Sequence, residues 1–217
     1  MKERPILFSG SMVRALLAGT KTQTRRAFSP RMEKLMRAAA AMGEVSHFLD
    51  EGSMQPNDLD YVRSFCPYGQ PGDKLWVREA FMHEPADYCW EASVSIPCRP
   101  AETAYRADFP NSQPGEGWKP SIHMPRNLSR ILLEITGVRV ERLQDISEAD
   151  ALAEGVPHSL NLPGGRFARE NFEHLWWTIN GDGSWESNPW VWVVEFKRVQ
   201  QASSGRPSQL EDAPCSA

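Results

Sequence analysis

The longest run of alternating apolar residues in the chain is Arg130–Leu143, and a single glycine, Gly137, interrupts it. Alternation with a period of two predicts a half-buried strand, and a glycine inside a strand is typical of a bulge or bend. The segments Lys74–Phe81 and Trp190–Val199 show the same alternation. The sequence therefore predicts a fold built on strands, the longest of which is bent.

Helical patterns fall between these strands in an irregular order. One helix is expected after Ser9 or Ser11, ending at Gly19, and a second over residues 31–42. A short helix should open at Ser147 and end at Gly155, and residues 166–179 should form another, while residues 5–8 read as a strand. Because strands and helices do not alternate regularly, a parallel doubly wound sheet is disfavoured. We expect an α+β fold, a small mixed or antiparallel β-barrel with flanking helices.

The chain is predicted to form one domain over residues 1–199. Two segments rich in turn residues, about 27–71 and 82–118, are expected to be insertions, and the first of them is either a plain insertion or a lid. The last segment, 200–217, is rich in Ser, Pro, Gln and Ala and is expected to be a disordered tail.

Charge is distributed unevenly along the chain. The net charge is −4, which argues against a generally basic nucleic-acid binder, but residues 1–37 contain nine Lys and Arg against two acidic residues. A local basic face can still meet phosphate, because salt screens distant charges beyond about 10 Å at 0.1 M. A solvated basic helix face explains the same pattern equally well.

Several classes of protein are excluded by what the sequence lacks. Four scattered cysteines, without a CxxC pair, indicate neither a zinc site nor a disulfide framework, so we expect reduced thiols and no metal. Walker, GxGxxG, HExxH and GxSxG motifs are also missing. With no membrane-length apolar run and no leader-like start, we expect a soluble cytoplasmic protein without a membrane partner.

Five segments in order resemble the ASCH family of the PUA-like superfamily, especially its larger phage- and prophage-type members. Together they span most of residues 5–199. The segments are residues 17–26 (LAGTKTQTRR), 72–79 (GDKLWVRE), 118–126 (WKPSIHMPR), 130–156 and 188–196 (NPWVWVVEF).

This resemblance implies a PUA-like β-barrel whose concave side holds a nucleobase or a nucleic-acid strand, with no cofactor. Small bacterial members that look similar are N4-acetylcytidine amidohydrolases that use a Lys, a Thr and a Glu. The motif Lys-Thr-x-Thr-x-Arg corresponds here to Lys21, Thr22, Thr24 and Arg26, and the later Glu corresponds to Glu154. The small members carry an apolar residue in place of Arg25 and lack both insertions. Other carboxylates compete with Glu154 for its role: Glu148, Asp150 and Glu79.

On this resemblance, the expected function is removal of the acyl group from N4-acylated cytosine nucleosides. Thr24 would act as nucleophile and Lys21 as its base, while Glu154 orients the lysine or the pyrimidine edge. A lysine is a base only when neutral, so its ordinary pKa of about 10.4 must fall, and burial or the neighbouring Arg25 and Arg26 would lower it. In a straight strand Lys21 and Thr24 would point to opposite faces, so this chemistry needs an irregular backbone after Gly19.

Further residues are candidates for contact with the substrate. The chain has eight tryptophans. Trp76, Trp192 and Trp118, in the predicted strands and loop, can stack on a base, whereas Trp176 and Trp177 are assigned to helix packing. The segment 118–126 carries several polar side chains around Pro120 and Pro125. It is expected to form a stiff loop whose donors can bind phosphate or base edges. His123 has no spaced partner for a metal. The candidate substrate-binding residues are Arg26, Trp76, Arg78, Glu79, Trp118, Lys119, Ser121, His123, Arg126 and Trp192.

Two other functions fit the same residues. If Lys21, Arg25 and Arg26 contact phosphates and the Thr24 hydroxyl binds backbone, the protein is a non-catalytic reader of RNA or of a modified base. A ribonuclease that uses the same lysine and hydroxyl groups is the third possibility. The expected partner is thus a nucleoside or modified base, with RNA as the alternative.

Overall fold

The computed structural model shows a mixed α+β protein. Residues 200–217, the predicted tail, lie outside the described part of the chain, as do the start of the predicted 166–179 helix and parts of both predicted insertions. The residues that the structure describes are 1–43, 56–85, 87–91, 94–99, 101–112, 117–156 and 167–199.

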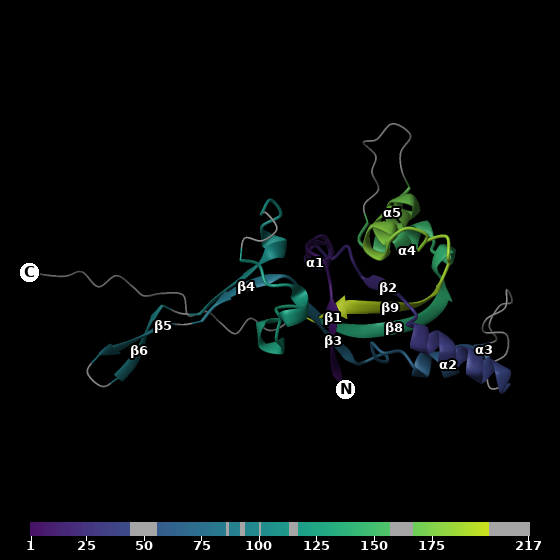
Figure 1. Ribbon diagram of the computed structural model, residues 1–217, viewed down its shortest axis with the longest axis horizontal. Coiled ribbons are helices and arrows are strands. Elements are labelled where there is room, and N and C mark those ends of the chain that lie inside the picture. The colour runs from purple at the N-terminus through teal and green to yellow at the C-terminus, as the bar shows by residue number, and fades with distance from the viewer. Residues whose placement is uncertain are drawn as a thin grey trace, which may run out of the picture.

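A five-stranded sheet forms the centre of the molecule (Figure 1). Its strand order is β1-β3-β8-β9-β2, in which β1 and β3 are parallel and all other neighbours are antiparallel. The strands are β1 (Glu3–Leu7), β2 (Gln23–Ala27), β3 (Lys74–Arg78), β8 (Leu132–Arg142) and β9 (Trp190–Arg198).

The longest strand, β8, carries the predicted bulge. Ile135 pairs with Phe196 and Gly137 with Glu195, so Thr136 is the extra residue on β8. A Cβ at Gly137 would lie 2.6 Å from a carboxylate oxygen of Glu195, which explains why glycine is needed at this close approach. The prediction of a bend at Gly137 is confirmed.

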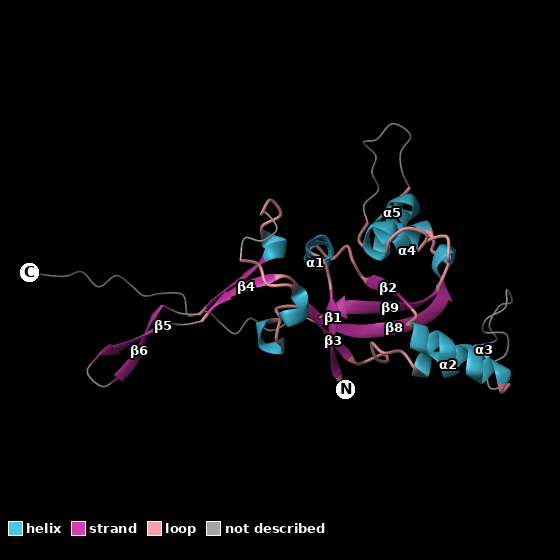
Figure 2. Cartoon of the chain, in the orientation of Figure 1, coloured by secondary structure: helices cyan, strands magenta, loops and turns pink. Residues whose placement is uncertain are grey.

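Both faces of the sheet are buried. Alternate residues of β9 belong to two core clusters, Trp192 and Val194 to one and Val191 and Val193 to the other, because successive side chains point to opposite faces. Helices α1, α2 and α3 supply residues to the first cluster, and α4 and α5 to the second (Figure 2). The helices are α1 (Gly10–Leu17), α2 (Pro30–Ala41), α3 (Pro56–Ser64), α4 (Glu148–Ala153) and α5 (Ala168–Asn180).

Serine side chains define where two of these helices begin. Ser29 accepts a hydrogen bond from the Met32 amide before α2, and Ser147 accepts one from the Asp150 amide before α4. Helix α2 buries Met32 and Met36 in the first core cluster. This part of the segment expected as an insertion or lid therefore belongs to the main body.

The segment between β3 and β8 contains strands that do not join the main sheet. Strands β4 (Phe81–Glu84) and β7 (Glu102–Tyr105) pair with each other, and β5 (Asp87–Glu91) pairs with β6 (Val94–Arg99). The β5–β6 hairpin projects away from the sheet in Figure 1. Short 3₁₀ turns follow at Arg106–Asp108, Ser121–His123, Arg126–Leu128 and Leu143–Asp145.

The expected barrel closure is not seen in the described residues. The sheet ends at β1 and β2, which are not paired with each other, so it is open and mostly antiparallel. A side chain links the two edges instead, since Arg26 Nη2 donates to the Leu7 carbonyl at 2.6 Å.

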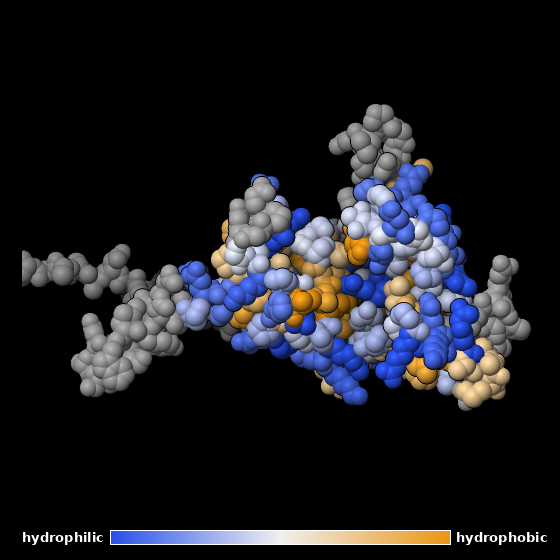
Figure 3. All heavy atoms as spheres, in the orientation of Figure 1, coloured by the Kyte–Doolittle hydropathy of each residue, from blue (hydrophilic) through white to orange (hydrophobic). Residues whose placement is uncertain are grey.

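Hydrophilic side chains cover most of the face seen in Figure 3, and apolar side chains gather near the centre of that view. No helix in the described ranges is both long and apolar enough to cross a membrane. Of the predicted reduced thiols, Cys66 is free and buried. Side-chain descriptions do not extend to Cys89, Cys98 and Cys215.

Candidate active site

The segment that links α1 to β2 is fixed by main-chain hydrogen bonds. The amides of Thr20 and Lys21 both donate to the Ala15 carbonyl, at 3.0 and 3.2 Å, and the Thr22 amide donates to Ala153 at 2.8 Å. An isolated antiparallel bridge joins Lys21 to Glu154. The start of β2 is therefore held against the end of α4, although the two are far apart in sequence.

Lys21 is buried, with no exposure of its side chain. Its Nζ donates to Glu154 Oε2 at 2.7 Å and to the Glu154 carbonyl at 2.9 Å, and it lies 5.5 Å from the centre of the Phe8 ring. Burial lowers the pKa of Lys21, Glu154 opposes this change, and the charges of Arg26 and Arg25 add to the lowering. Burial outweighs the pairing with Glu154, so the pKa of Lys21 lies below its ordinary value.

Arg25 is the second cation beside Glu154. Its side chain is fully buried, and Nη1 donates to Glu154 Oε1 at 3.3 Å. The same guanidinium binds Glu141 through Nε, at 2.9 Å, and through Nη2, and its Nη2 lies 3.4 Å from Asp150 Oδ2. Glu154 is therefore fixed on both carboxylate oxygens, by Lys21 on one and Arg25 on the other.

An ion-pair network continues from Arg25 across the sheet. Arg139 binds Glu195, Glu141 and Asp150 at 2.9, 2.8 and 3.0 Å, and Gln23 donates to Asp150 at 3.0 Å. Although burial raises the pKa of Asp150, hydrogen bonds from Gln23 and Ser147 and the charges of Arg25 and Arg139 lower it to about 2. This network holds β2, β8 and α4 in register.

Of the four carboxylates considered from the sequence, Glu154 is the one that contacts Lys21. Glu148 accepts the Arg169 amide at 3.4 Å near the surface, and Asp150 belongs to the network of Arg139. Glu79 forms a bidentate pair with Arg130 at 2.9 and 3.0 Å. Of these four carboxylates, Glu154 alone pairs with the lysine that the sequence predicts as the base.

Thr24 and Glu154 line one small cavity, of about 60 Å³. Its walls are the residues of β2 from Thr24 to Ala27, Met12 of α1 and one side of α5. Thr24 is buried, with 2% exposure. The volume is well below the roughly 300–1,000 Å³ of pockets for drug-sized ligands.

Lys21 and Thr24 do not form a hydrogen bond with each other. The chain turns at Gly19 (φ +76°), before Lys21, and the bridge at Lys21 and strand β2 follow directly. The irregular backbone needed to bring both side chains together is therefore not found between Lys21 and Thr24. Glu154 contacts the amine of Lys21 and lines the same cavity as Thr24.

Arg26 lies on the same cavity and has a free donor. Its Nη2 donates to the Leu7 carbonyl and its guanidinium lies 5.4 Å from the centre of the Phe8 ring. Its Nε is buried without a hydrogen-bond partner among the described residues. A buried N–H of this kind is costly unless a ligand or water accepts from it.

Other predicted site residues form a second group, at the end of β3. Arg78 lies 5.3 Å from the centre of the Trp76 ring, and its Nε donates to the Met124 carbonyl at 3.1 Å, while Nη2 binds the Ile122 carbonyl. Lys119 exchanges main-chain hydrogen bonds with Phe81 at 2.7 and 3.1 Å. Arg78 thus holds the 118–126 segment in place.

Three of the remaining candidates have structural partners. Glu79 is 1% exposed, and burial raises its pKa while the pairing with Arg130 lowers it. Arg126 pairs with Glu3 at 2.9 Å near the surface, and the Trp118 ring packs 5.8 Å from Phe109. Ser121 is half-buried and His123 is exposed.

Two tryptophan assignments need correction. Trp192 is 1% exposed and packs 4.4 Å from Phe28 in the first core cluster, so its ring is not accessible to a base. Trp176 packs in the second cluster as expected, but Trp177 is 45% exposed. Trp192 and Trp176 lie on faces that other elements cover, whereas Trp177 lies on a face of α5 that stays open to solvent.

The sequence did not identify the roles of Arg139 and Glu141. Both alternate with the apolar residues of β8, a pattern that places them on one face of that strand. Their separation of two residues was the only signal in the sequence that both side chains lie on the same face of the strand. Arg25, expected to lower the pKa of Lys21 or to contact phosphate, binds Glu154 directly.

No three His, Cys, Asp or Glu side chains in the described part of the chain lie close enough to hold a metal ion. Comparison of the chain with protein-family models, with curated proteins and with solved structures finds no match.

Proposed function

We propose that the protein is a metal-independent amidohydrolase that removes the acyl group from N4-acylated cytosine nucleosides. The single observation that carries this proposal is the buried Lys21–Glu154 pair beside a cavity that Thr24 and Glu154 both line. We also propose that the open sheet, whose edges Arg26 links, is a variant of the PUA-like barrel.

Thr24 Oγ1 forms a bond to the acyl carbon of the substrate, and its proton passes to the Lys21 amine. Because Glu154 contacts that amine and lines the cavity, we assign the relay of the proton to its carboxylate. The C–N4 bond then breaks, the proton returns to N4, and the cytosine amine leaves. Water hydrolyses the acyl-Thr24 ester and regenerates the hydroxyl.

Arg26 supplies the donor for the developing oxyanion. Its buried Nε–H has no partner among the described residues and belongs to a residue that lines the cavity of Thr24. A fixed donor in a buried site stabilises negative charge that develops in the transition state. This role gives a function to an otherwise unsatisfied group.

The cavity limits which part of the substrate can enter. Its volume of about 60 Å³ exceeds the roughly 10–15 Å³ that a cavity needs to hold one water molecule, so it accommodates a group of a few heavy atoms. An acetyl group fits this description, whereas a whole nucleoside does not. The acyl amide therefore enters while the base and sugar remain at the mouth.

Conversion of N4-acetylcytidine to cytidine, followed by chromatography, tests the proposal. Thr24→Val, Glu154→Gln and Lys21→Ala should each reduce kcat by about 100-fold or more. Thr20→Val is the matched control, because it removes an exposed hydroxyl four residues away that donates only to the Ala15 carbonyl. No turnover by the wild-type protein, or full turnover by Lys21→Ala, contradicts the proposal.

A non-catalytic RNA-binding or modified-base-binding module is the second candidate. It is favoured by a cavity of about 380 Å³ lined by Arg14, Arg106 and Ser121, which presents cations and hydroxyls suited to phosphate. Salt-dependent retardation of RNA in a gel, with intact RNA and no nucleoside turnover, identifies this function. Cleaved RNA in the same assay identifies a ribonuclease.

A further inference from the structure

Helix α5 has an exposed aromatic face that the proposed reaction does not use. Phe172 and Trp176 pack into the second core cluster, whereas Trp177 is 45% exposed and lies 5.9 Å from the His174 ring. An exposed indole presents a large aromatic face with a polar N–H at its edge, which suits contact with a ligand.

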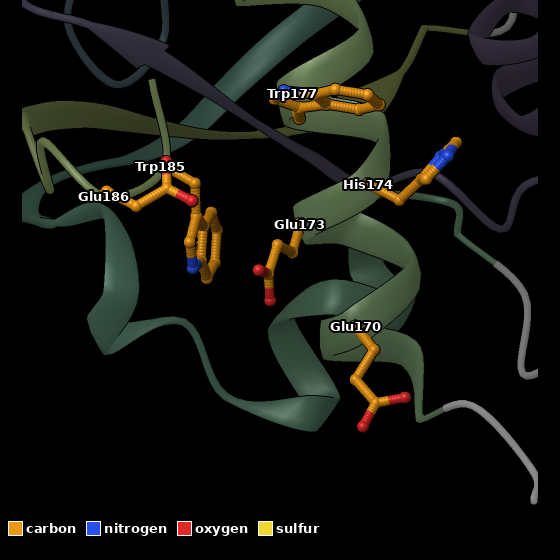
Figure 4. A pocket seen from close by; sticks show the side chains of 6 residues that line it. All are labelled: Glu170, Glu173, His174, Trp177, Trp185 and Glu186. Carbon is orange, nitrogen blue, oxygen red and sulfur yellow. The ribbon is translucent and has the colours of Figure 1, made fainter. Parts of the chain in front are cut away.

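A cavity of about 400 Å³ lies between this face and the turn that precedes β9, a size typical of small-molecule sites. In Figure 4, Trp185 of the turn lies beside Glu173 of α5, with Trp177 one turn further along the helix. We name this cavity the acidic-aromatic pocket. It is lined by Glu170, Glu173, His174, Trp177, Trp185 and Glu186.

The carboxylates of the acidic-aromatic pocket are exposed and carry no described cation partner. Its three glutamates make no ion pair with any described residue. Trp185 is only 8% exposed, and it lines the pocket together with Trp177. The pocket therefore combines exposed carboxylates with two indole rings.

The arrangement of these groups favours an organic cation over a metal ion. No three potential metal ligands in the described part of the chain are close enough to hold a metal, so the carboxylates of the pocket are spread along its walls. Aromatic faces attract ammonium groups, and surrounding carboxylates add to that attraction. Two indoles and three carboxylates around one hollow provide both contributions.

We propose that the acidic-aromatic pocket binds an alkylammonium group. The glutamates balance its charge, Trp177 and Trp185 contact its methylene groups, and the Trp185 N–H donates to an acceptor close to the cation. A lysine side chain within a peptide supplies such an acceptor in its neighbouring carbonyl groups, whereas a free polyamine has none. The preferred source is therefore a lysine of a peptide. This proposal does not rest on the amidohydrolase function.

Isothermal titration at low salt tests the proposal with three probes: acetyl-Gly-Lys-Gly-amide, its Nε-acetylated counterpart and spermidine. The lysine peptide should bind saturably and more weakly as salt is added, and the neutral Nε-acetylated peptide should not bind. Glu173→Gln and Trp177→Ala should each weaken binding by about tenfold. Glu33→Gln, the same charge change in the first turn of α2, should leave affinity unchanged.

Three results bear against the proposal or refine it. Absence of saturable binding by both cations overturns it, and so does an unchanged affinity in both pocket variants. Tighter binding of spermidine than of the lysine peptide retains the ligand chemistry but assigns it to a free polyamine. Trp177→Phe, which keeps an aromatic face, should restore most of the affinity lost in Trp177→Ala, and thermal unfolding of each variant shows whether the fold is intact.

Discussion

Lys21 is bound twice by Glu154, through the carboxylate at 2.7 Å and the main-chain carbonyl at 2.9 Å. The two residues also share an isolated β-bridge, so both backbone and side chain fix their relative position. The entry to β2 and the end of α4 are thereby joined at the residue to which we assign the catalytic amine.

This pairing predicts strong energetic coupling. Breaking a buried ion pair leaves an uncompensated charge, so Lys21→Met and Glu154→Gln should each lower the free energy of unfolding by about 3 kcal/mol. The double variant should lose less than the sum, with a coupling of about 1–3 kcal/mol. Urea denaturation of the four proteins measures this cycle, and additive effects would show that the pair is not coupled.

The lowered pKa of Lys21 predicts an alkaline dependence of stability. Burial holds the pKa of Lys21 in the folded protein below its ordinary value of 10.5. At a pH between the folded-state pKa and 10.5, the unfolded chain therefore binds more protons at this site than the folded protein does. The contribution of Lys21 to the free energy of unfolding therefore rises with pH across that interval. Comparison of wild type with Lys21→Met at increasing pH isolates this contribution. Equal slopes for the two proteins would mean that the pKa is not lowered.

Asp150 predicts a loss of stability in acid. Its pKa of about 2 in the folded protein lies below the ordinary value of 3.8, so its stabilising contribution is complete above pH 3.8. That contribution is lost as the pH falls toward 2, because the unfolded chain then binds the proton more readily. Asp150→Asn should be less stable than wild type at neutral pH, and the difference should shrink in acid. A constant difference across this range would contradict the assignment.

Gly155 leaves the space that Lys21 needs, and we predict that a side chain at this position would displace Lys21. Its φ of +83° disfavours other residues, and an added Cβ would lie 2.9 Å from Lys21 Cβ and 2.8 Å from Ala15 Cβ. Gly155→Ala should therefore lower both stability and turnover. Gly43→Ala is the matched control, because Gly43 also has a positive φ (+75°) but nothing within 4 Å of an added Cβ. It should cost only about 1 kcal/mol and leave turnover unchanged. Equal effects of the two changes would show that contact with Lys21 is unimportant.

Local signals in the sequence were sufficient for much of the secondary structure. The glycine in β8 marks the bulge, and Ser147 begins α4 as predicted. Helix α3 was missed because the turn-forming residues 55–58 include its first helical turn, where Pro56 is tolerated. The β5–β6 hairpin was missed because residues 82–118 show no clear alternation.

Long-range pairing determined what the sequence did not reveal. Arg25 and Glu141 are separated by 116 positions, and no local pattern indicates that they meet. The exposure of Trp177 and the burial of Trp192 depend on which faces of α5 and β9 other elements cover. The openness of the sheet likewise depends on how its two edge strands approach each other in space.

Detection of an acyl-enzyme tests the central claim most directly. Wild-type protein mixed with N4-acetylcytidine, quenched rapidly and examined by intact and peptide mass spectrometry, should carry one acetyl group on Thr24, with release of cytidine. Thr24→Val should carry none. An acetyl group that persists in Thr24→Val, or cytidine release by that variant at the wild-type rate, would contradict the assignment of Thr24 as nucleophile.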